Sequence, residues 1–120
     1  MLVWSSDSVM VFHYLYESDE NAGWLVVAPV RHITRWIELS KAEVVEVAQV
    51  LELLDVAVTE MFGLARTVVA SLGWLIDEHL HIHCARVPSG EAGSMSADEV
   101  CAQLRERMSA LVVTSDEIDD

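Results

Sequence analysis

Positive charge is the scarcest property of this 120-residue sequence. It has 7 Lys and Arg residues against 20 Asp and Glu residues, so its net charge is −13, and Lys41 is its only lysine. Proteins bind long nucleic acids through basic patches that displace counterions, and so acidic a chain argues against that function. A small phosphorylated ligand, held by backbone amides and a few Arg or His side chains, is compatible with this charge.

Cysteine and uncharged apolar runs are also scarce. Cys84 and Cys101 are too few for a disulfide framework and lack the spacing of zinc-binding pairs. The first residues have neither the basic start nor the long apolar run of a signal peptide. The most apolar stretch, 44–62, is interrupted by acidic residues, whereas a membrane-spanning helix needs about 20 nearly uncharged residues. We therefore expect a cytoplasmic protein that does not bind to or span a membrane.

Hydrophobic residues are plentiful. They form 52% of the sequence, and the mean hydropathy is +0.32, which excludes a disordered tail. The mass of 13.4 kDa is enough for one hydrophobic core but not for two. We expect a single domain over residues 1–113, followed by an acidic, frayed tail over residues 114–120.

Four segments have the residue pattern of β-strands. Residues 8–16 are rich in β-branched and aromatic types, and residues 24–30 form a continuous apolar run that Pro29 should end. Residues 65–72 follow the same preference for β-branched types. Residues 79–87 alternate between polar and apolar side chains, as expected of a strand.

Two helices begin at sequences of the capping-box type, in which Ser and Glu three residues apart satisfy free backbone amides of the first turn. Ser40 and Glu43 begin a helix that Gly63 should end, and Ser96 and Glu99 begin another that runs to about residue 112. The predicted order is therefore β-β-α-β-β-α. Strands without regular βαβ alternation favour an α+β fold with an antiparallel sheet.

The first helix has two apolar surfaces. The wider one covers an arc of about 140° and is expected to face the core. It consists of Val44, Val47, Val50, Leu51, Leu54, Ala57, Val58, Met61 and Phe62. Val45, Ala48, Leu53 and Val56 lie outside that arc, among acidic residues. They are either scattered surface residues, which are common, or a second face that contacts a partner subunit.

Histidines alternate within the last predicted strand. His79, His81 and His83 stand at i, i+2 and i+4, so a regular strand projects all three from one face and Cys84 from the other. We expect Cys84 to be a core residue rather than a reactive thiol. Buried imidazoles need hydrogen-bond partners, and three in register therefore favour a functional site over a structural role.

Two chemistries use such a row of imidazoles. In one, the histidines bind zinc, which requires a further ligand and supporting carboxylates; Asp77 and Glu78 lie nearby in the sequence. In the other, one imidazole attacks phosphorus while its neighbours position it. Neutral imidazole, with an ordinary pKa of about 6.5, suits that role. The residues alone leave both open.

The segment His79-Leu80-His81-Ile82-His83-Cys84-Ala85 resembles the His-φ-His-φ-His-φ-φ motif (φ is an apolar residue) of the histidine triad (HIT) superfamily of nucleotide hydrolases and transferases. Residues 23–33 resemble the strand that reads Gly-His-φ-φ-φ-x-Pro-x-x-His in that family. Residues 11–13 resemble the strand before it. The similarity runs from about residue 9 to residue 87, and the chain length agrees with small Hint-type members.

This resemblance implies a HIT-like antiparallel sheet with one long helix and a C-terminal helix, and a homodimer whose sheet continues across both subunits. It implies that His81 attacks the α-phosphate of a nucleotide, such as a phosphoramidate or a dinucleoside polyphosphate, and forms a covalent nucleotidyl-histidine that water hydrolyses. His83 would share the hydrogen-bond network of the nucleophile. His79 would order the strand and the leaving-group side, and His32 would complete the cluster. The family mechanism uses no metal and no cofactor.

Several family positions differ in this chain. Tyr14 stands where an Asp or Asn usually holds the ribose, and Trp24 stands where His is common. The usual Asn and Gly-Gln-Ser/Thr upstream of the triad are missing from residues 70–78. There, Ser71 is the nearest substitute for a phosphate contact, and Trp74 either lines a base pocket or packs in the core. Losing phosphate-directed donors removes transition-state stabilisation.

Two functions therefore remain open. The first is a HIT-type nucleotide hydrolase or nucleotidyl transferase, with Tyr14, Ser71 and Trp74 in its nucleotide pocket. The second is a HIT-fold nucleotide-binding or regulatory module with little or no turnover. Four basic residues outside the helices are the candidates for further contacts with an anion: Arg31, Arg35, Arg66 and Arg86.

Overall fold

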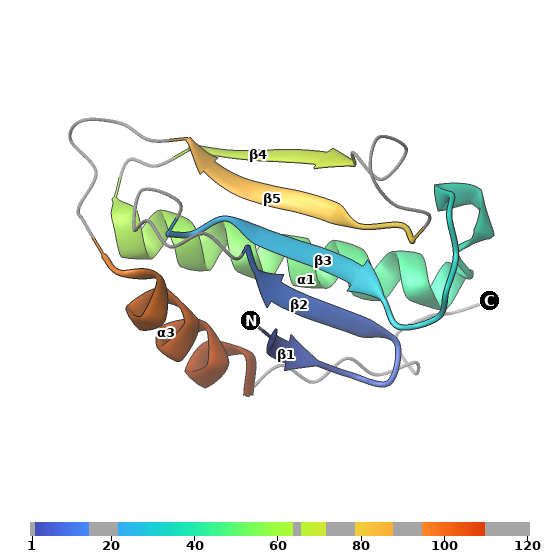
Figure 1. Ribbon diagram of the computed structural model, residues 1–120, viewed down its shortest axis with the longest axis horizontal. Helices are drawn as coiled ribbons and strands as arrows, with labels where there is room; N and C mark the ends of the chain where they lie inside the picture. The colour runs from blue at the N-terminus through green and yellow to red at the C-terminus, as the bar shows by residue number, and fades with distance from the viewer. Residues whose placement is uncertain (1, 15–21, 64–65, 72–78, 88–94, 110–120) are drawn as a thin grey trace.

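Five strands form one antiparallel sheet, and a long helix packs across one face of it (Figure 1). The computed structural model describes residues 2–14, 22–63, 66–71, 79–87 and 95–109. The strands are β1 (Leu2–Ser5), β2 (Val9–His13), β3 (Leu25–Pro29), β4 (Arg66–Ser71) and β5 (Ile82–Val87). Their order in the sheet is β1-β2-β3-β5-β4, so β4 lies at one edge.

The helical elements are the short 3-10 helix η2 (Trp36–Glu38), the long helix α1 (Lys41–Phe62) and the C-terminal helix α3 (Ala97–Ser109). Helix α1 contacts β2, β3, β4 and β5, whereas α3 contacts β1 and α1. The α+β class, the antiparallel sheet, the long helix and the C-terminal helix are all confirmed. The acidic tail predicted over residues 114–120 lies outside the described residues.

The strand predictions were right in position and differed at the ends. Three strands lie inside the predicted segments 8–16, 24–30 and 65–72, and Pro29 is the last residue of β3, opposite Val9. The segment 79–87 was too long, because β5 begins only at Ile82. Strand β1 was not predicted; it has four residues, of which only Val3 is buried, so its apolar pattern is weak.

Helix α1 begins at the predicted capping box. The hydroxyl of Ser40 accepts a hydrogen bond from the backbone amide of Glu43 (3.1 Å), and the Glu43 carboxylate accepts one from the Ser40 amide (2.7 Å). The guanidinium of Arg31 also donates to this carboxylate, at 2.7 Å. Gly63 ends the helix with φ of +73°, a conformation that glycine adopts without steric cost. In α3, the Ser96 hydroxyl accepts from the Glu99 amide, which is half of a capping box.

The core lies between the sheet and the two helices. Buried residues of α1, of α3 and of the central strands form one main cluster. The predicted core face of α1 was wrong at Val44, whose side chain is 45% exposed, while Glu43 and Glu46 are buried in its place. Both carboxylates have polar partners there. Glu43 accepts hydrogen bonds from Arg31 and Ser40, and Glu46 accepts one from the hydroxyl of Ser6. Those partners let two acidic side chains be buried at positions that the apolar pattern left outside the core face.

The second apolar surface of α1 is divided. Leu53 packs partly against the core, Val45 is half-buried, and Ala48 and Val56 are exposed, Val56 by 49%. In α3, Val100, Leu104 and Met108 are buried as the sequence predicted, and Leu111 lies outside the described residues. Across the described residues, no helix is long and apolar enough to cross a membrane.

The contact between Arg31 and Glu43 predicts a specific dependence of stability on pH. The Arg31 guanidinium, followed by the Ser40 amide and hydroxyl, holds the pKa of Glu43 down at about 2 from an ordinary 4.5. A depressed carboxyl pKa stabilises the fold above the unfolded-state value, and that contribution is lost as the pH falls through the folded-state value. We expect Glu43→Gln to lower the free energy of unfolding by about 1–2 kcal/mol at pH 7.

The difference between Glu43→Gln and the unsubstituted chain should shrink as the pH falls from about 4.5 towards 2. Urea unfolding at several pH values measures it. Glu52→Gln, an exposed change on the same helix, is the control and should leave the free energy of unfolding nearly unchanged. A Glu43→Gln difference that stays constant over this pH range contradicts the assignment.

Candidate functional site

The three alternating histidines lie at and before the start of β5. His83 is on the strand, whereas His79 and His81 precede it in a segment tied to the loop after β3, where the Leu80 amide donates to the Ile33 carbonyl at 2.7 Å. The rings therefore form two pairs rather than one even row. His81 and His83 meet edge to face with 5.0 Å between ring centroids, and His79 meets His32 in the same way at 5.1 Å.

His81 is oriented by the backbone of its own segment. Its Nδ1 lies 2.9 Å from the carbonyl oxygen of His79. A carbonyl only accepts hydrogen bonds, so Nδ1 carries the proton. In the neutral ring, Nε2 is then unprotonated and carries a lone pair. His81 is partly exposed, so this lone pair belongs to a ring that a ligand can reach.

His83 is set in the opposite tautomer by Trp24. The indole Nε1–H donates to Nδ1 of His83 at 2.9 Å, which leaves the proton of the neutral ring on Nε2. That Nε2 is buried and has no hydrogen-bond partner among the described residues. Burial, and then the charge of neighbouring His81, lower the pKa of His83, so the ring stays neutral.

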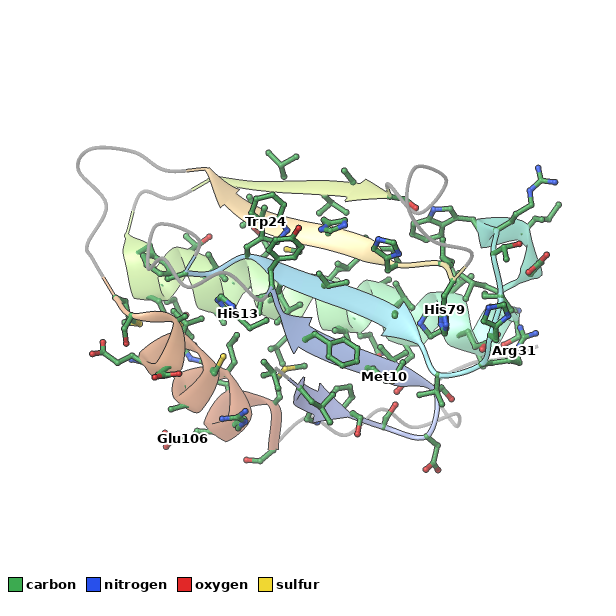
Figure 2. The ribbon with its side chains drawn as sticks, viewed as in Figure 1. Met10, His13, Trp24, Arg31, His79 and Glu106 are labelled. Atoms are coloured by element: carbon green, nitrogen blue, oxygen red, sulfur yellow. The ribbon has the colours of Figure 1, made fainter. Side chains whose placement is uncertain are left out.

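His79 connects the site to the end of β3. Its Nε2 donates to the carbonyl of Pro29 at 2.8 Å, which fixes the ring that packs against His32. In Figure 2, Trp24 lies near the beginning of β3 and His79 near its end. The candidate site therefore extends along β3 and the start of β5.

Two aromatic rings, those of Tyr14 and Trp24, pack beside His83. Tyr14 stacks on Trp24 with 4.8 Å between centroids, and both rings meet His83 edge to face, at 6.0 and 5.9 Å. The Tyr14 amide also donates to the Trp24 carbonyl at 2.9 Å. Tyr14, predicted as a nucleotide contact, thus lies against the histidine cluster. Trp24, which the sequence analysis noted only as a difference from the family, lies beside it.

The opposite side of β5 belongs to the core. Cys84, the residue after His83, is 1% exposed and lies in the main apolar cluster, as the alternation predicted. Burial raises the pKa of its thiol to about 11, so it is not a nucleophilic thiolate. Strand β5 therefore lies between the hydrophobic core, which Cys84 faces, and the histidine cluster, which His83 faces.

A further histidine supports the site from the core side. His13, on β2, is 4% exposed; its Nδ1 donates to the Tyr14 carbonyl at 2.9 Å, and its Nε2 accepts from the Gly23 amide at 3.1 Å. It thereby holds the backbone on both sides of the Tyr14–Trp24 stack. The sequence placed His13 in a family-like strand but gave no sign of this role, because these two contacts are made to backbone atoms.

The remaining predicted contacts are less direct. The Ser71 hydroxyl lies 3.5 Å from the carbonyl of His81, at the long limit for a hydrogen bond. Arg31 is engaged with Glu43 and with the Glu38 carbonyl. Trp74, Asp77 and Glu78 lie outside the described residues, as do the side chains of Arg66 and Arg86.

The zinc hypothesis has no donor set in the described parts of the chain. No three His, Cys, Asp or Glu residues there are placed to hold a metal ion.

No protein-family profile and no curated protein matches the sequence. Solved structures do match the fold. A histidine triad nucleotide-binding protein from Sulfolobus tokodaii is 17% identical with a TM-score of 0.65, over 99% of this chain and 88% of that one. Diadenosine triphosphate hydrolase from Plasmodium falciparum is 11% identical with a TM-score of 0.65, over 98% of this chain and 77% of that one.

Two longer proteins also contain the fold. A uridylyltransferase matches 92% of this chain with a TM-score of 0.68 at 16% identity, and this chain spans 42% of its length. The NitFhit protein of C. elegans matches 92% of this chain with a TM-score of 0.67 at 18% identity, and this chain spans 27% of it. Together with the sheet order and the paired histidines, these matches show that the chain has the fold of the histidine triad superfamily.

Proposed function

We propose that the protein is a nucleotide hydrolase or nucleotidyl transferase in which Nε2 of His81 attacks the α-phosphorus of a small nucleotide. The observation that carries this proposal is the 2.9 Å contact between Nδ1 of His81 and the His79 carbonyl, which leaves the lone pair on Nε2. Proteins with this fold include a diadenosine triphosphate hydrolase and a uridylyltransferase. Nucleotidyl-histidine chemistry accounts for both reaction types.

The reaction balances in two steps. The Nε2 lone pair forms a bond to phosphorus while the bond from phosphorus to the leaving group breaks, and the leaving group departs with that electron pair. The ring is then a cation, and its Nδ1–H bond to the His79 carbonyl becomes charge-assisted and stronger. Water, or an acceptor nucleotide, next attacks the phosphorus, releases Nε2 with its electron pair and gives up a proton to solvent.

The other site residues have supporting roles in this proposal. His83 donates from Nε2 to an oxygen atom of the bound nucleotide, which satisfies a buried donor. His79 and His32 hold the segment that bears the nucleophile, through the Pro29 carbonyl and their own ring contact. The Tyr14–Trp24 stack offers an aromatic surface beside the phosphate, and Ser71 and Trp74 remain candidate nucleotide contacts.

A second candidate is a nucleotide-binding module with little turnover. The residues of β4 opposite the start of β5 favour it: Ala70 pairs with His83 and has no polar side chain, and the Ser71 hydroxyl lies near the His81 carbonyl. A site with a nucleophile but few phosphate donors binds its ligand and reacts slowly. Calorimetry that finds nucleotide affinity without hydrolysis favours this candidate over the enzyme.

The adduct on His81 tests the enzymatic proposal. Incubation with a dinucleoside polyphosphate or an adenosine phosphoramidate, followed by rapid quenching at high pH, should trap a phosphorus–nitrogen adduct that peptide mapping assigns to His81. The His81→Ala variant should form no adduct and should lose about 10³-fold or more in kcat/KM.

His32→Asn is the matched control, because it changes a histidine of the cluster that bears no transferred group. It should still form the adduct, at a reduced rate. Turnover by His81→Ala equal to that of the unsubstituted chain defeats the proposal.

We further propose that the chain forms a homodimer through the edge strand β4. Val68 and Val69 on this strand are 51% and 53% exposed, and an unpaired edge with apolar side chains favours pairing with another strand. A second copy of the chain would continue the antiparallel sheet. We also propose a cytoplasmic location, because the chain has few cysteines.

Light scattering of the purified protein should give twice the chain mass of 13.4 kDa. The double variant Val68→Lys, Val69→Lys should be monomeric, because two charges at the edge repel their copies in an antiparallel pair. Val56→Lys, on the exposed surface of α1, should stay dimeric. Dissociation by Val56→Lys alone would place the interface on α1 instead.

A further inference from the structure

In the described part of the chain, the indole of Trp24 donates a hydrogen bond to His83, and the chemistry of the indole fixes the tautomer of His83. An indole N–H donates and never accepts, so Nδ1 of His83, 2.9 Å from it, must be unprotonated. A histidine or a hydroxyl at this position would allow either tautomer, because those groups both donate and accept. Tryptophan allows only one.

The proton of His83 therefore resides on Nε2, and that atom is unsatisfied. The side chain is more than nine-tenths buried, at 7% exposure, and Nε2 has no partner among the described residues. A buried donor without an acceptor destabilises the ligand-free protein. The cost is recovered when a ligand brings an acceptor atom to this point, one ring away from His81.

The surroundings hold the indole in place. Tyr14 stacks on its face at an interplanar angle of 19°, and the Tyr14 amide donates to the Trp24 carbonyl. On the other side, the Gly23 amide donates to the buried ring of His13. Because both the ring and the backbone of Trp24 are fixed, the bond to His83 does not depend on a mobile side chain.

A second proton would have to enter His83 at Nδ1 and break the bond to Trp24. Burial already opposes that charge, and so does a charged His81. Among the described residues, the other groups beside the ring give it no negative partner. Tyr14 presents a ring edge, and the cross-strand neighbours Val26 on β3 and Ala70 on β4 are apolar.

We propose that Trp24 is a positioning residue that locks His83 as a neutral Nε2–H donor, and that the site therefore favours nucleotides whose leaving group departs as a stable anion. A neutral imidazole held this way donates a hydrogen bond but cannot give up its only ring proton at useful cost, so it is a poor general acid. Phosphate and nucleoside phosphate leaving groups need no proton to depart, whereas the amine of a phosphoramidate does. The substrate class accordingly is a dinucleoside polyphosphate or related anhydride.

The tautomer of His83 tests the lock directly. In long-range proton–nitrogen spectra of the ¹⁵N-labelled protein at pH 7, Nδ1 of His83 should be unprotonated and Nε2 protonated, with scalar coupling from Trp24 Nε1 to Nδ1 across the hydrogen bond. A proton on Nδ1 in the unsubstituted chain overturns the proposal, and this result does not depend on any variant folding.

Trp24→Phe keeps an aromatic ring but removes the donor. The spectra should then show a mixture of tautomers, because no donor holds Nδ1 of His83 unprotonated. Trp36→Phe is the matched control, since Trp36 lies on η2 and is 45% exposed; it should leave the His83 signals unchanged. Unchanged His83 signals in a folded Trp24→Phe variant overturn the lock.

The substrate preference rests on the proposed function, and its test separates the two. The kcat/KM for a dinucleoside polyphosphate should exceed that for an adenosine phosphoramidate by about tenfold or more, and Trp24→His, which gives His83 a partner able to exchange protons, should narrow that ratio. Failure of the proposed function appears as no turnover of either substrate and no adduct on His81, while the His83 tautomer is as expected. Failure of the inference appears as an adduct on His81 together with a ratio that Trp24→His does not change.

Discussion

The chemistry of this site depends on one hydrogen bond, from Nδ1 of His81 to the carbonyl of its near neighbour His79. Without it, the proton of the neutral ring would be shared between two nitrogens and the ring would rotate. The carbonyl is itself held in place, because the Leu80 amide donates to Ile33 and the His79 ring donates to Pro29. A backbone segment fixed at two points therefore determines which nitrogen of His81 faces a ligand.

Neighbouring imidazoles thus have opposite tautomers. His81 carries its proton on Nδ1 because a carbonyl accepts it, and His83 carries its proton on Nε2 because an indole donates to the other nitrogen. The pair consequently presents one lone pair and one donor, on rings whose centroids lie 5.0 Å apart. In the proposed function, the lone pair is the nucleophile and the N–H donor contacts a phosphate oxygen, without the help of a charged histidine.

Much of this could be predicted from the sequence. The capping box at Ser40 and Glu43, the end of α1 at Gly63 and the burial of Cys84 follow from local patterns, and all three hold. The predicted strand 79–87 was too long, because polar and apolar residues also alternate at His79 and His81, which precede β5. The sequence carries no record of the hydrogen bonds that tie this segment to β3.

The roles of Trp24 and His13 could not be predicted for a different reason. Each acts through a partner far away in the sequence or through backbone atoms, His13 through Tyr14 and Gly23, and Trp24 through His83. Side-chain periodicity identifies which face a residue occupies, but not which atom it contacts across the sheet. Val44 illustrates the same limit, since polar partners for Glu43 and Glu46 changed which residues of α1 are buried.

The most direct measurement is the position of the phosphorus on the trapped ring. Phosphorus–nitrogen correlation spectra of the ¹⁵N-labelled adduct distinguish the two nitrogens of a histidine. Phosphorus should be bonded to Nε2 of His81, and Nδ1 should keep its proton. Phosphorus on Nδ1 of His81, or on another histidine of the cluster, would contradict this assignment.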